Sequence, residues 1–212
     1  MAALPASSAH EIVVLESGDR MSQPEFHRRY CASKVTRAEL IEGVVYVSSP
    51  QRSKYHGRQE NELGAWVGVY RARRADVSAA HNSTLILDAD NEVQPDVTVW
   101  REGGGAYEDA DGYIRGVPEL VIEIAASSRS IDLGDKMRAY RRNGVREYIV
   151  CRVLDGELDW FLLRDAEYAR LAPDAEGVIE SEAFPGLRLP VAALLAGDLA
   201  AVLAALPAPH GD

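Results

Sequence analysis

The spacing of apolar residues along the chain predicts four helices. The longest covers residues 53–72, where apolar side chains recur at intervals of three and four and so share one face of a helix. These side chains belong to Leu63, Trp66, Val67 and Tyr70. Shorter helices are predicted over residues 22–30, residues 133–142 and the alanine- and leucine-rich residues 191–206. Gly144 suits the end of the third of these four helices.

Runs of β-branched and aromatic residues predict strands between these helices. Turn residues join most of them into hairpins, with Glu42-Gly43 in the first, residues 88–91 in the second and Asp155-Gly156 in the third. The hairpin strands are the two halves of residues 39–47, residues 84–87 with 93–100, and residues 145–153 with 158–163. Residues 120–125 form a further strand, whereas residues 101–116, rich in Gly, Asp and Glu, are predicted to form a surface loop.

This mixture of elements places the chain in the α/β (α+β) class. With 212 residues, 47% of them hydrophobic, the chain can bury one sizeable core, and neither an internal repeat nor a linker divides it. We therefore expect a flexible N-terminal tail over residues 1–15, a single domain over residues 16–206 and a C-terminal tail over residues 207–212.

The charge and the cysteines narrow the possible functions. A net charge of -10 argues against a protein that coats nucleic acid generally, because such binding depends on clustered Lys and Arg. Two local arginine clusters remain, namely Arg71, Arg73 and Arg74, and Arg138, Arg141 and Arg142. Cys31 and Cys151 are too few and too far apart for a zinc-ligand pattern. Without a signal-peptide pattern or an apolar run of membrane-span length, a cytoplasmic protein with no membrane partner is expected.

One carboxylate stands inside an apolar strand. Alternate residues of 120–125 point to opposite faces, so Glu123 shares its face with apolar neighbours. Burial raises the pKa of a carboxyl group unless a cation or hydrogen bonds favour the ionised form, and a metal ion would remove that cost. The alternative interpretation is a buried glutamate paired with an arginine elsewhere, such as Arg115 or Arg146.

Three more polar residues are candidates for the same site. Asp96 follows Pro95 at the start of a predicted strand, although Pro-Asp pairs are also common at turns. Lys136 lies beside the helix stripe that should face the sheet, so it either extends to solvent or projects toward Asp96 and Glu123. His56 lies on the apolar face of its helix, where it is either a packed residue or a ligand or proton carrier. Two carboxylates and a fixed positive charge suit metal-dependent hydrolysis of a phosphodiester.

Taken in order, the short motifs of the chain resemble a known family. They run from about residue 22 to residue 195 and comprise Glu39-Leu40-Ile41-Glu42-Gly43, Ser49-Pro50 with His56, Pro95-Asp96, Glu123 with Ser127, Asp132 with Lys136 and Tyr140, and Gly144-Val145-Arg146-Glu147-Tyr148. No single motif is specific, but their order and spacing resemble the putative restriction endonuclease family of the PD-(D/E)XK nuclease superfamily. The resemblance implies a restriction-endonuclease-like fold, in which a mixed central sheet is flanked by helices.

The resemblance also implies roles for individual residues. Asp96, Glu123 and the backbone carbonyl of Ile124 would bind Mg²⁺ or Mn²⁺, and Lys136 would orient the attacking water or stabilise charge on the phosphate. Glu39 matches an early acidic position of the family and is a further candidate catalytic residue, as is His56, although a hairpin residue such as Glu39 is otherwise expected to be exposed.

Two departures from the family pattern bear on these roles. In the wider superfamily the lysine follows the second carboxylate by two residues, where this chain has Ala125, but the resembled family places it on the next helix, where Lys136 stands. The loop after the glutamate strand reads Ser127-Ser128-Arg129-Ser130 instead of Ser-Pro-Ser-Thr, which leaves its shape open.

The function expected from these observations is that of a metal-dependent endonuclease acting on nucleic acid, with DNA as the expected substrate and a homodimer as the expected assembly. Two alternatives stay open. The fold could serve as a catalytically inactive binding or assembly module, because fold and function separate readily. A metal-dependent hydrolase of small phosphate compounds would also fit the acidic charge.

Overall fold

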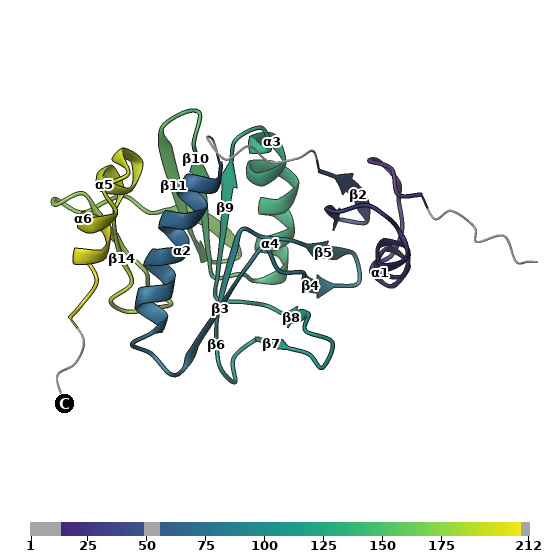
Figure 1. The fold of residues 1–212 in the computed structure, drawn as a ribbon, viewed down its shortest axis with the longest axis horizontal. Helices are drawn as coiled ribbons and strands as arrows, with labels where there is room; N and C mark the ends of the chain where they lie inside the picture. Colours follow the sequence, from purple (N-terminus) through teal and green to yellow (C-terminus); the bar gives the residue numbers. More distant parts are fainter. Residues whose placement is uncertain (1–13, 49–55, 209–212) are drawn as a thin grey trace, which may run out of the picture.

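The computed structural model describes residues 14–48 and 56–208 and shows a mixed α+β fold built around two six-stranded sheets (Figure 1). The sheet that we call the central sheet has the strand order β12 (Glu167–Arg170), β11 (Glu157–Arg164), β10 (Glu147–Arg152), β9 (Leu120–Ala125), β6 (Val97–Arg101) and β3 (Val77–His81). Its β9 and β10 run parallel, and the other neighbouring pairs are antiparallel. A helical connection between β9 and β10 allows this parallel pairing.

The second six-stranded sheet, which we call the peripheral sheet, packs on one face of the central sheet. Its strand order is β2 (Val44–Val47), β1 (Ala38–Ile41), β5 (Asn91–Val93), β4 (Leu85–Asp88), β8 (Ile114–Gly116) and β7 (Ala106–Glu108). The helical connection lies on this face too and comprises α3 (Arg129–Ile131), the π-helical turn η2 (Asp132–Lys136) and α4 (Met137–Asn143). On the outer side of the peripheral sheet, α1 (Gln23–Ala32) buries Phe26 against Leu40 and Val45.

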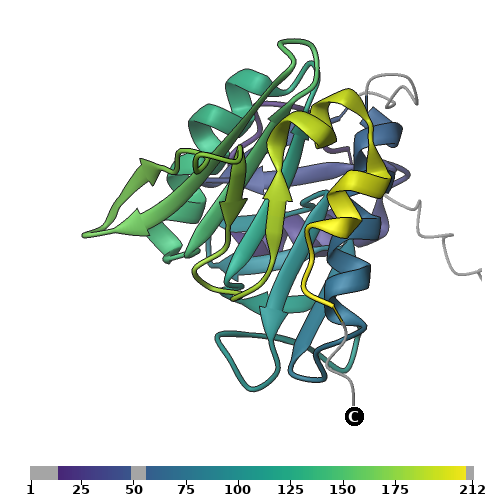
Figure 2. The same ribbon diagram turned by 90° about the vertical axis from the view of Figure 1, so that its left-hand side faces the viewer.

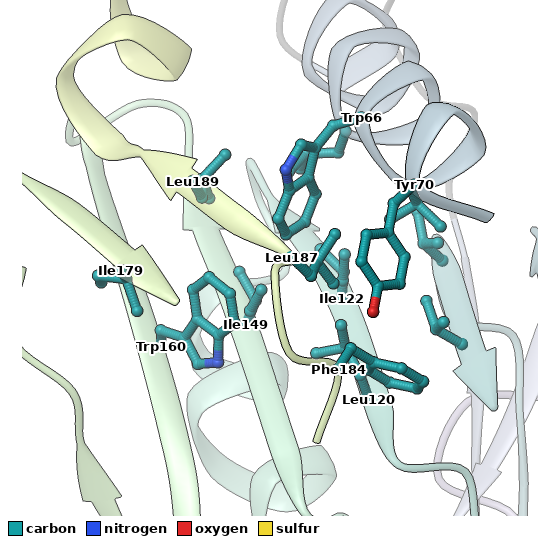
Figure 3. Close-up of a cluster of buried hydrophobic side chains, with 14 of the residues drawn as sticks. Trp66, Tyr70, Leu120, Ile122, Ile149, Trp160, Ile179, Phe184, Leu187 and Leu189 are labelled. Atoms are coloured by element: carbon teal, nitrogen blue, oxygen red, sulfur yellow. The ribbon is translucent and has the colours of Figure 1, made fainter. Parts of the chain in front are cut away.

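The opposite face of the central sheet is covered by α2 (Arg58–Arg71) and by the C-terminal part of the chain. That part comprises β13 (Val178–Glu180), β14 (Arg188–Pro190), α5 (Val191–Ala196) and α6 (Leu199–Ala204). Figure 2 shows the two C-terminal helices beside α2. Trp66 of α2 meets Trp160 of β11 edge to face at a ring distance of 6.0 Å, and Tyr70 meets Phe184 in the same manner (Figure 3). The apolar stripe predicted for residues 53–72 therefore faces the sheet.

Several sequence predictions are confirmed by this architecture. The first hairpin turns at Glu42 and Gly43, whose φ angles of 51° and 73° are typical of a two-residue turn. The strand over residues 120–125 matches β9, and the third hairpin matches β10 and β11. Gly144 ends α4 in the left-handed conformation, with φ 87°.

Three expectations about the helices and strands are wrong. Residues 93–100 are not one strand, because β5 ends at Val93 in the peripheral sheet and β6 begins at Val97 in the central sheet; Pro95, which lacks a backbone N–H, lies between them. Residues 101–116 are not a loop, since they contain the short hairpin of β7 and β8. The last helix is divided at Gly197, where φ is 74°. The helix predicted over residues 133–142 is confirmed by η2 and α4, and its first turn is π-helical.

Besides β7 and β8, four strands fall where the sequence predicted none, namely β3, β12, β13 and β14. The predicted start of the helix over residues 53–72 lies partly outside the described residues, and α2 itself begins at Arg58. No helix in the described ranges combines the length and the apolar character that a membrane span requires.

Candidate active site: a buried carboxylate–lysine cluster

Glu123 lies in the middle of β9, on the face that points toward η2 and α4. The side chain is 2% exposed, and its neighbours on this face, Val121 and Ala125, belong to the core beneath those helices. Its Oε1 accepts hydrogen bonds from Nζ of Lys136 at 2.9 Å and from the hydroxyl of Tyr140 at 2.8 Å. The buried glutamate is thus paired with a lysine.

The two arginines considered as alternative partners of Glu123 pair elsewhere. Arg115 binds Asp109 with an N–O distance of 2.5 Å, and Arg146 lies 3.9 Å from Glu182. The interpretation of Glu123 as one half of a buried glutamate–arginine pair is therefore wrong.

Lys136, the last residue of η2, lies at the centre of the cluster. Its Nζ is 2.9 Å from Oε1 of both Glu39 and Glu123, and 3.8 Å from Oδ1 of Asp132. The residue is 3% exposed, so its side chain does not extend to solvent. One ammonium group thereby joins carboxylates from β1, β9 and η2.

Asp96 lies immediately before β6, next to Glu123 at the same end of the central sheet. The register that pairs Val97 with Ile122 brings these ends of β6 and β9 together. Oδ2 of Asp96 accepts a hydrogen bond from the backbone N–H of Ile124 at 2.6 Å, and Oδ1 lies 3.0 Å from Nε2 of His56. Pro95, which has no backbone N–H, fits this position. The chain leaves the peripheral sheet here, so no N–H is needed for pairing with a neighbouring strand.

Glu39 reaches the cluster from the peripheral sheet. Although it belongs to the first hairpin, it is 5% exposed, so the expectation of an exposed hairpin residue is wrong. Its Oε1 accepts a hydrogen bond from the backbone N–H of Gln94 at 2.7 Å, in addition to its contact with Lys136. The face of the hairpin that carries Glu39 is covered by the central sheet and its helix, which local sequence does not reveal.

His56 lies just before α2 and contacts Asp96 from the other side. Its Nε2 is also 3.7 Å from Oε2 of Glu60, and the side chain is largely buried. Burial alone would lower the pKa of His56, but the hydrogen bond with Asp96 and the charges of Asp96 and Glu60 raise it. The histidine therefore carries a proton more readily than usual and can hold Asp96 in its ionised form.

Three further residues complete the cluster and were given no role from sequence. Asp132 is 1% exposed, accepts a hydrogen bond from Oγ of Ser128 at 2.5 Å and lies one helical turn before Lys136. Tyr140 donates to Glu123, one helical turn after Lys136. Arg37 precedes β1 and directs Nη2 to the carbonyl of Gln94 at 2.9 Å and to Asp96 at 3.5 Å. Helical spacing from Lys136 could have identified the first two, whereas Arg37 follows no pattern.

The cluster contains more carboxylates than permanent cations. Four buried carboxylates, those of Glu39, Asp96, Glu123 and Asp132, surround the two permanent cations Lys136 and Arg37. When all four carboxylates are ionised and His56 is neutral, negative charge remains uncompensated. In a site of low dielectric constant this surplus favours the uptake of protons or of a cation.

The pKa values of the buried groups follow from this surplus. Burial raises the pKa of Glu123 well above its usual range, and the neighbouring carboxylates raise it further despite Lys136. Burial likewise raises the pKa of Asp132. The pKa of Asp96 is lowered, because the hydrogen bond and charge of His56 outweigh burial. Glu123, Glu39 and Asp132 raise the pKa of Lys136 although burial alone would lower it, so the lysine stays charged.

The donor atoms of the cluster suit a hard divalent cation. Carboxylate oxygens are the protein ligands that Mg²⁺ prefers, and Mg²⁺ keeps several waters when few carboxylates bind it. Lys136 and Tyr140 both use Oε1 of Glu123, so neither of them engages Oε2. Within residues 14–48 and 56–208, however, no three His, Cys, Asp or Glu side chains stand together as a ready-made metal cage. A metal would therefore draw on Asp96 and Glu123 with water and substrate oxygens.

Comparisons with known proteins bear on the family and the fold of the chain. A family model described as Uma2, putative restriction endonuclease, matches residues 23–192, which include every residue of the cluster. Among solved structures, the chain is similar to a putative nuclease belonging to DUF820 from Anabaena variabilis ATCC 29413, with a TM-score of 0.64 and 15% sequence identity over 80% of this chain and 97% of that chain. This likeness shows a shared fold. None of the curated proteins compared with the chain matches it.

Proposed function

The chain belongs to the Uma2 family of putative restriction endonucleases, and from this premise we propose that it is a metal-dependent endonuclease that hydrolyses phosphodiester bonds of nucleic acid, with DNA as its substrate. The observation that carries the proposal is the meeting of Asp96, Glu123 and Lys136 at one end of the central sheet. Carboxylates and a fixed ammonium group from three separate elements converge there.

The proposed cofactor is Mg²⁺ or Mn²⁺. Asp96 and Glu123 would bind it with their carboxylate oxygens, and the backbone carbonyl of Ile124 would add a third oxygen ligand. When bound, such an ion supplies Lewis-acid chemistry, because it polarises a phosphoryl oxygen and lowers the pKa of a bound water. The uncompensated negative charge of the cluster supports this assignment.

Lys136 supplies a fixed positive charge beside the reacting phosphate. Its raised pKa keeps the ammonium group protonated, so it does not act as the general base. Instead, it orients the attacking water or stabilises the negative charge that develops on the phosphate oxygens, and a charge held in a dry site does so effectively. The hydrogen bonds to Glu39 and Glu123 hold the ammonium group in place.

Glu39 and His56 have proposed supporting roles. Glu39 anchors Lys136 and can accept a hydrogen bond from the attacking water, since its carboxylate lies against the same ammonium group as Glu123. His56 holds one oxygen of Asp96, which leaves the other facing the N–H of Ile124. The two residues thus fix the orientation of the carboxylate that would bind the metal.

Cleavage of plasmid and single-stranded DNA in the presence of Mg²⁺ or Mn²⁺ tests the proposal. The unchanged chain should cut, and Lys136→Ala should not. Lys34→Ala, which removes an exposed lysine two residues after the end of α1, is the matched control and should cut as the unchanged chain does. Loss of activity in Lys136→Ala and not in Lys34→Ala, with circular dichroism showing that both variants are folded, would support a place for Lys136 in the site.

Other outcomes of this experiment separate the alternatives. Equal cleavage by the unchanged chain and Lys136→Ala would point to a contaminant or to another catalytic group. Metal binding without cleavage of nucleic acid, but with turnover of a small phosphate diester, would favour the small-substrate hydrolase. No cleavage and no metal binding would favour the non-catalytic binding module.

A further inference from the structure

A second group of reactive side chains lies outside the carboxylate–lysine cluster. It comprises Cys31 and His27 on α1, Glu92 on β5 and Tyr113 just before β8. Cys31 is exposed, whereas Glu92 is only 2% exposed. Figure 1 shows α1 at the opposite end of the molecule from α5 and α6. A thiol, an imidazole and a buried carboxylate in contact are the components of a nucleophile, a base and the group that orients the base.

The buried carboxylate sets the orientation of the imidazole. Nδ1 of His27 lies 3.0 Å and 3.1 Å from the two oxygens of Glu92, and Nε2 of Gln23 donates to the same carboxylate at 2.7 Å. Since a carboxylate accepts hydrogen bonds, Nδ1 of His27 carries the proton. In the neutral ring Nε2 is then the acceptor, and this atom faces Cys31.

The thiol lies within reach of this acceptor. Sγ of Cys31 is 3.7 Å from Nε2 of His27, one turn earlier on α1, and 3.8 Å from the hydroxyl of Tyr113. The thiol proton can pass to Nε2, which leaves a thiolate beside an imidazolium that Glu92 stabilises. The hydrogen bond with Cys31 and burial raise the pKa of Tyr113, so its hydroxyl keeps its proton and can donate to the thiolate.

We propose that Cys31 is an activated thiol that reacts with hydroperoxides to form a sulfenic acid. The thiolate sulfur attacks one peroxide oxygen, a sulfur–oxygen bond forms and the oxygen–oxygen bond breaks. The sulfur loses two electrons and the peroxide gains them. The departing oxygen takes the proton from Nε2 of His27 and leaves as water or, for an organic hydroperoxide, as an alcohol. A hydroperoxide suits the site because its leaving group needs the proton that His27 holds next to the sulfur.

The other cysteine cannot convert this product to a disulfide within the folded chain. Cys151 is fully buried in the core between the central sheet and α2, whereas Cys31 is exposed on the far side of the peripheral sheet. Burial also raises the pKa of the Cys151 thiol to about 12, which keeps it unreactive. The sulfenic acid on Cys31 therefore stays open to an external thiol or a chemical trap.

Trapping of the sulfenic acid tests this inference. The folded full-length chain is treated with hydrogen peroxide at neutral pH in the presence of dimedone, and the adduct is located by mass spectrometry. Cys31 should be labelled about tenfold faster in the folded chain than in urea, where the thiol has no fixed neighbours. Cys31→Ser should carry no label.

Matched variants separate activation from mere exposure. His27→Gln should react about tenfold more slowly than the unchanged chain, because the base is lost, and Tyr113→Phe should also be slower. His81→Gln removes an exposed histidine on β3 and should react at the unchanged rate. Equal rates in the folded and unfolded chains, or labelling of Cys151 in the folded chain, would overturn the inference. If circular dichroism shows that His27→Gln is unfolded, the folded-against-urea comparison and Tyr113→Phe decide the question.

Discussion

Nζ of Lys136 lies 2.9 Å from Oε1 of Glu123, and both side chains are almost completely buried. A buried ion pair contributes little net stability over an apolar pair, but removal of one partner leaves an uncompensated charge in a medium of low dielectric constant. In this chain the consequence is larger, because Glu39 and Asp132 depend on the same ammonium group. Lys136 therefore supports the fold as well as the proposed reaction.

Lys136→Met keeps the length of the side chain and removes its charge. We expect the free energy of unfolding at pH 7 to fall by roughly 3–5 kcal/mol, since three carboxylates lose their counter-ion. Urea unfolding measures this loss, with Lys34→Met as the control. A loss below about 1 kcal/mol would show that the carboxylates are neutral in the folded chain and do not need the lysine.

Added Mg²⁺ should stabilise the chain. At a concentration 100-fold above the dissociation constant, linkage raises the free energy of unfolding by about 2.7 kcal/mol. Thermal melts with and without Mg²⁺ should therefore differ for the unchanged chain. Asp96→Asn should abolish the difference, and Asp111→Asn, which alters an exposed carboxylate, should preserve it. An equal shift in both variants would place the metal elsewhere.

Glu147 provides a test of stability away from the cluster. This fully buried residue of β10 accepts hydrogen bonds from Trp160 at 3.1 Å, from Ser181 at 2.8 Å and from the N–H of Ala183 at 2.8 Å. Glu147→Ala leaves these donors unsatisfied and should lower the free energy of unfolding by about 3 kcal/mol or more. Urea unfolding would contradict the prediction if the free energy of unfolding fell no more than it does on substitution of an exposed residue.

Glu147 should also make the stability of the chain depend on pH. Burial raises the pKa of Glu147 in the folded chain above its unfolded value, although its hydrogen bonds oppose the shift. The contribution of Glu147 to the free energy of unfolding is therefore fully present below the pKa of Glu147 in the unfolded chain. It declines as pH rises through the pKa of Glu147 in the folded chain. Glu147→Gln lacks this titration, so the melting temperature of the variant should gain relative to that of the unchanged chain between those two pKa values. A constant difference would show that the carboxyl does not titrate there.

Substitution by alanine should lower the free energy of unfolding by different amounts at two glycines with positive φ. At Gly144 a Cβ would meet no atom within 4 Å, so Gly144→Ala should cost about 1 kcal/mol for the left-handed backbone alone. At Gly116 a Cβ would collide with the backbone carbonyl of Gly105. Gly116→Ala should therefore cost about 3 kcal/mol or more, and urea unfolding of the two variants should show the difference.

Periodicity identified Glu123 and Lys136 because each lies in one regular element whose buried face is visible in the sequence. Strand alternation placed the glutamate among apolar neighbours, and helix spacing placed the lysine beside the core stripe. The π-helical turn at Asp132–Lys136 could not be predicted, but it leaves Lys136 directed at the sheet. These residues were accessible to sequence reasoning because the relevant spacing is local.

Glu39 and Arg37 show where local spacing fails. Alternation tells which residues of a hairpin share a face, but burial of Glu39 depends on how the peripheral sheet packs against η2 and the central sheet. Arg37 lies before the hairpin, and its partners Gln94 and Asp96 are distant in sequence. The two short strands β7 and β8 escaped prediction for a related reason: β8 is held by pairing with β4, β7 is held by pairing with β8, and both carry few apolar residues.

The connection from β5 to β6 also determines at which stage of folding the proposed active site is complete. The residues between these strands connect the two sheets, and Asp96 lies immediately before the central sheet's β6, whereas Glu39 lies in the peripheral sheet. Pairing of β1 with β5 joins segments far apart in sequence, so it is entropically slow to form. A folding intermediate that contains only the central sheet would hold Asp96 and Glu123 without Glu39. The proposed hydrolysis, in which Glu39 supports Lys136, would therefore require the completed tertiary structure.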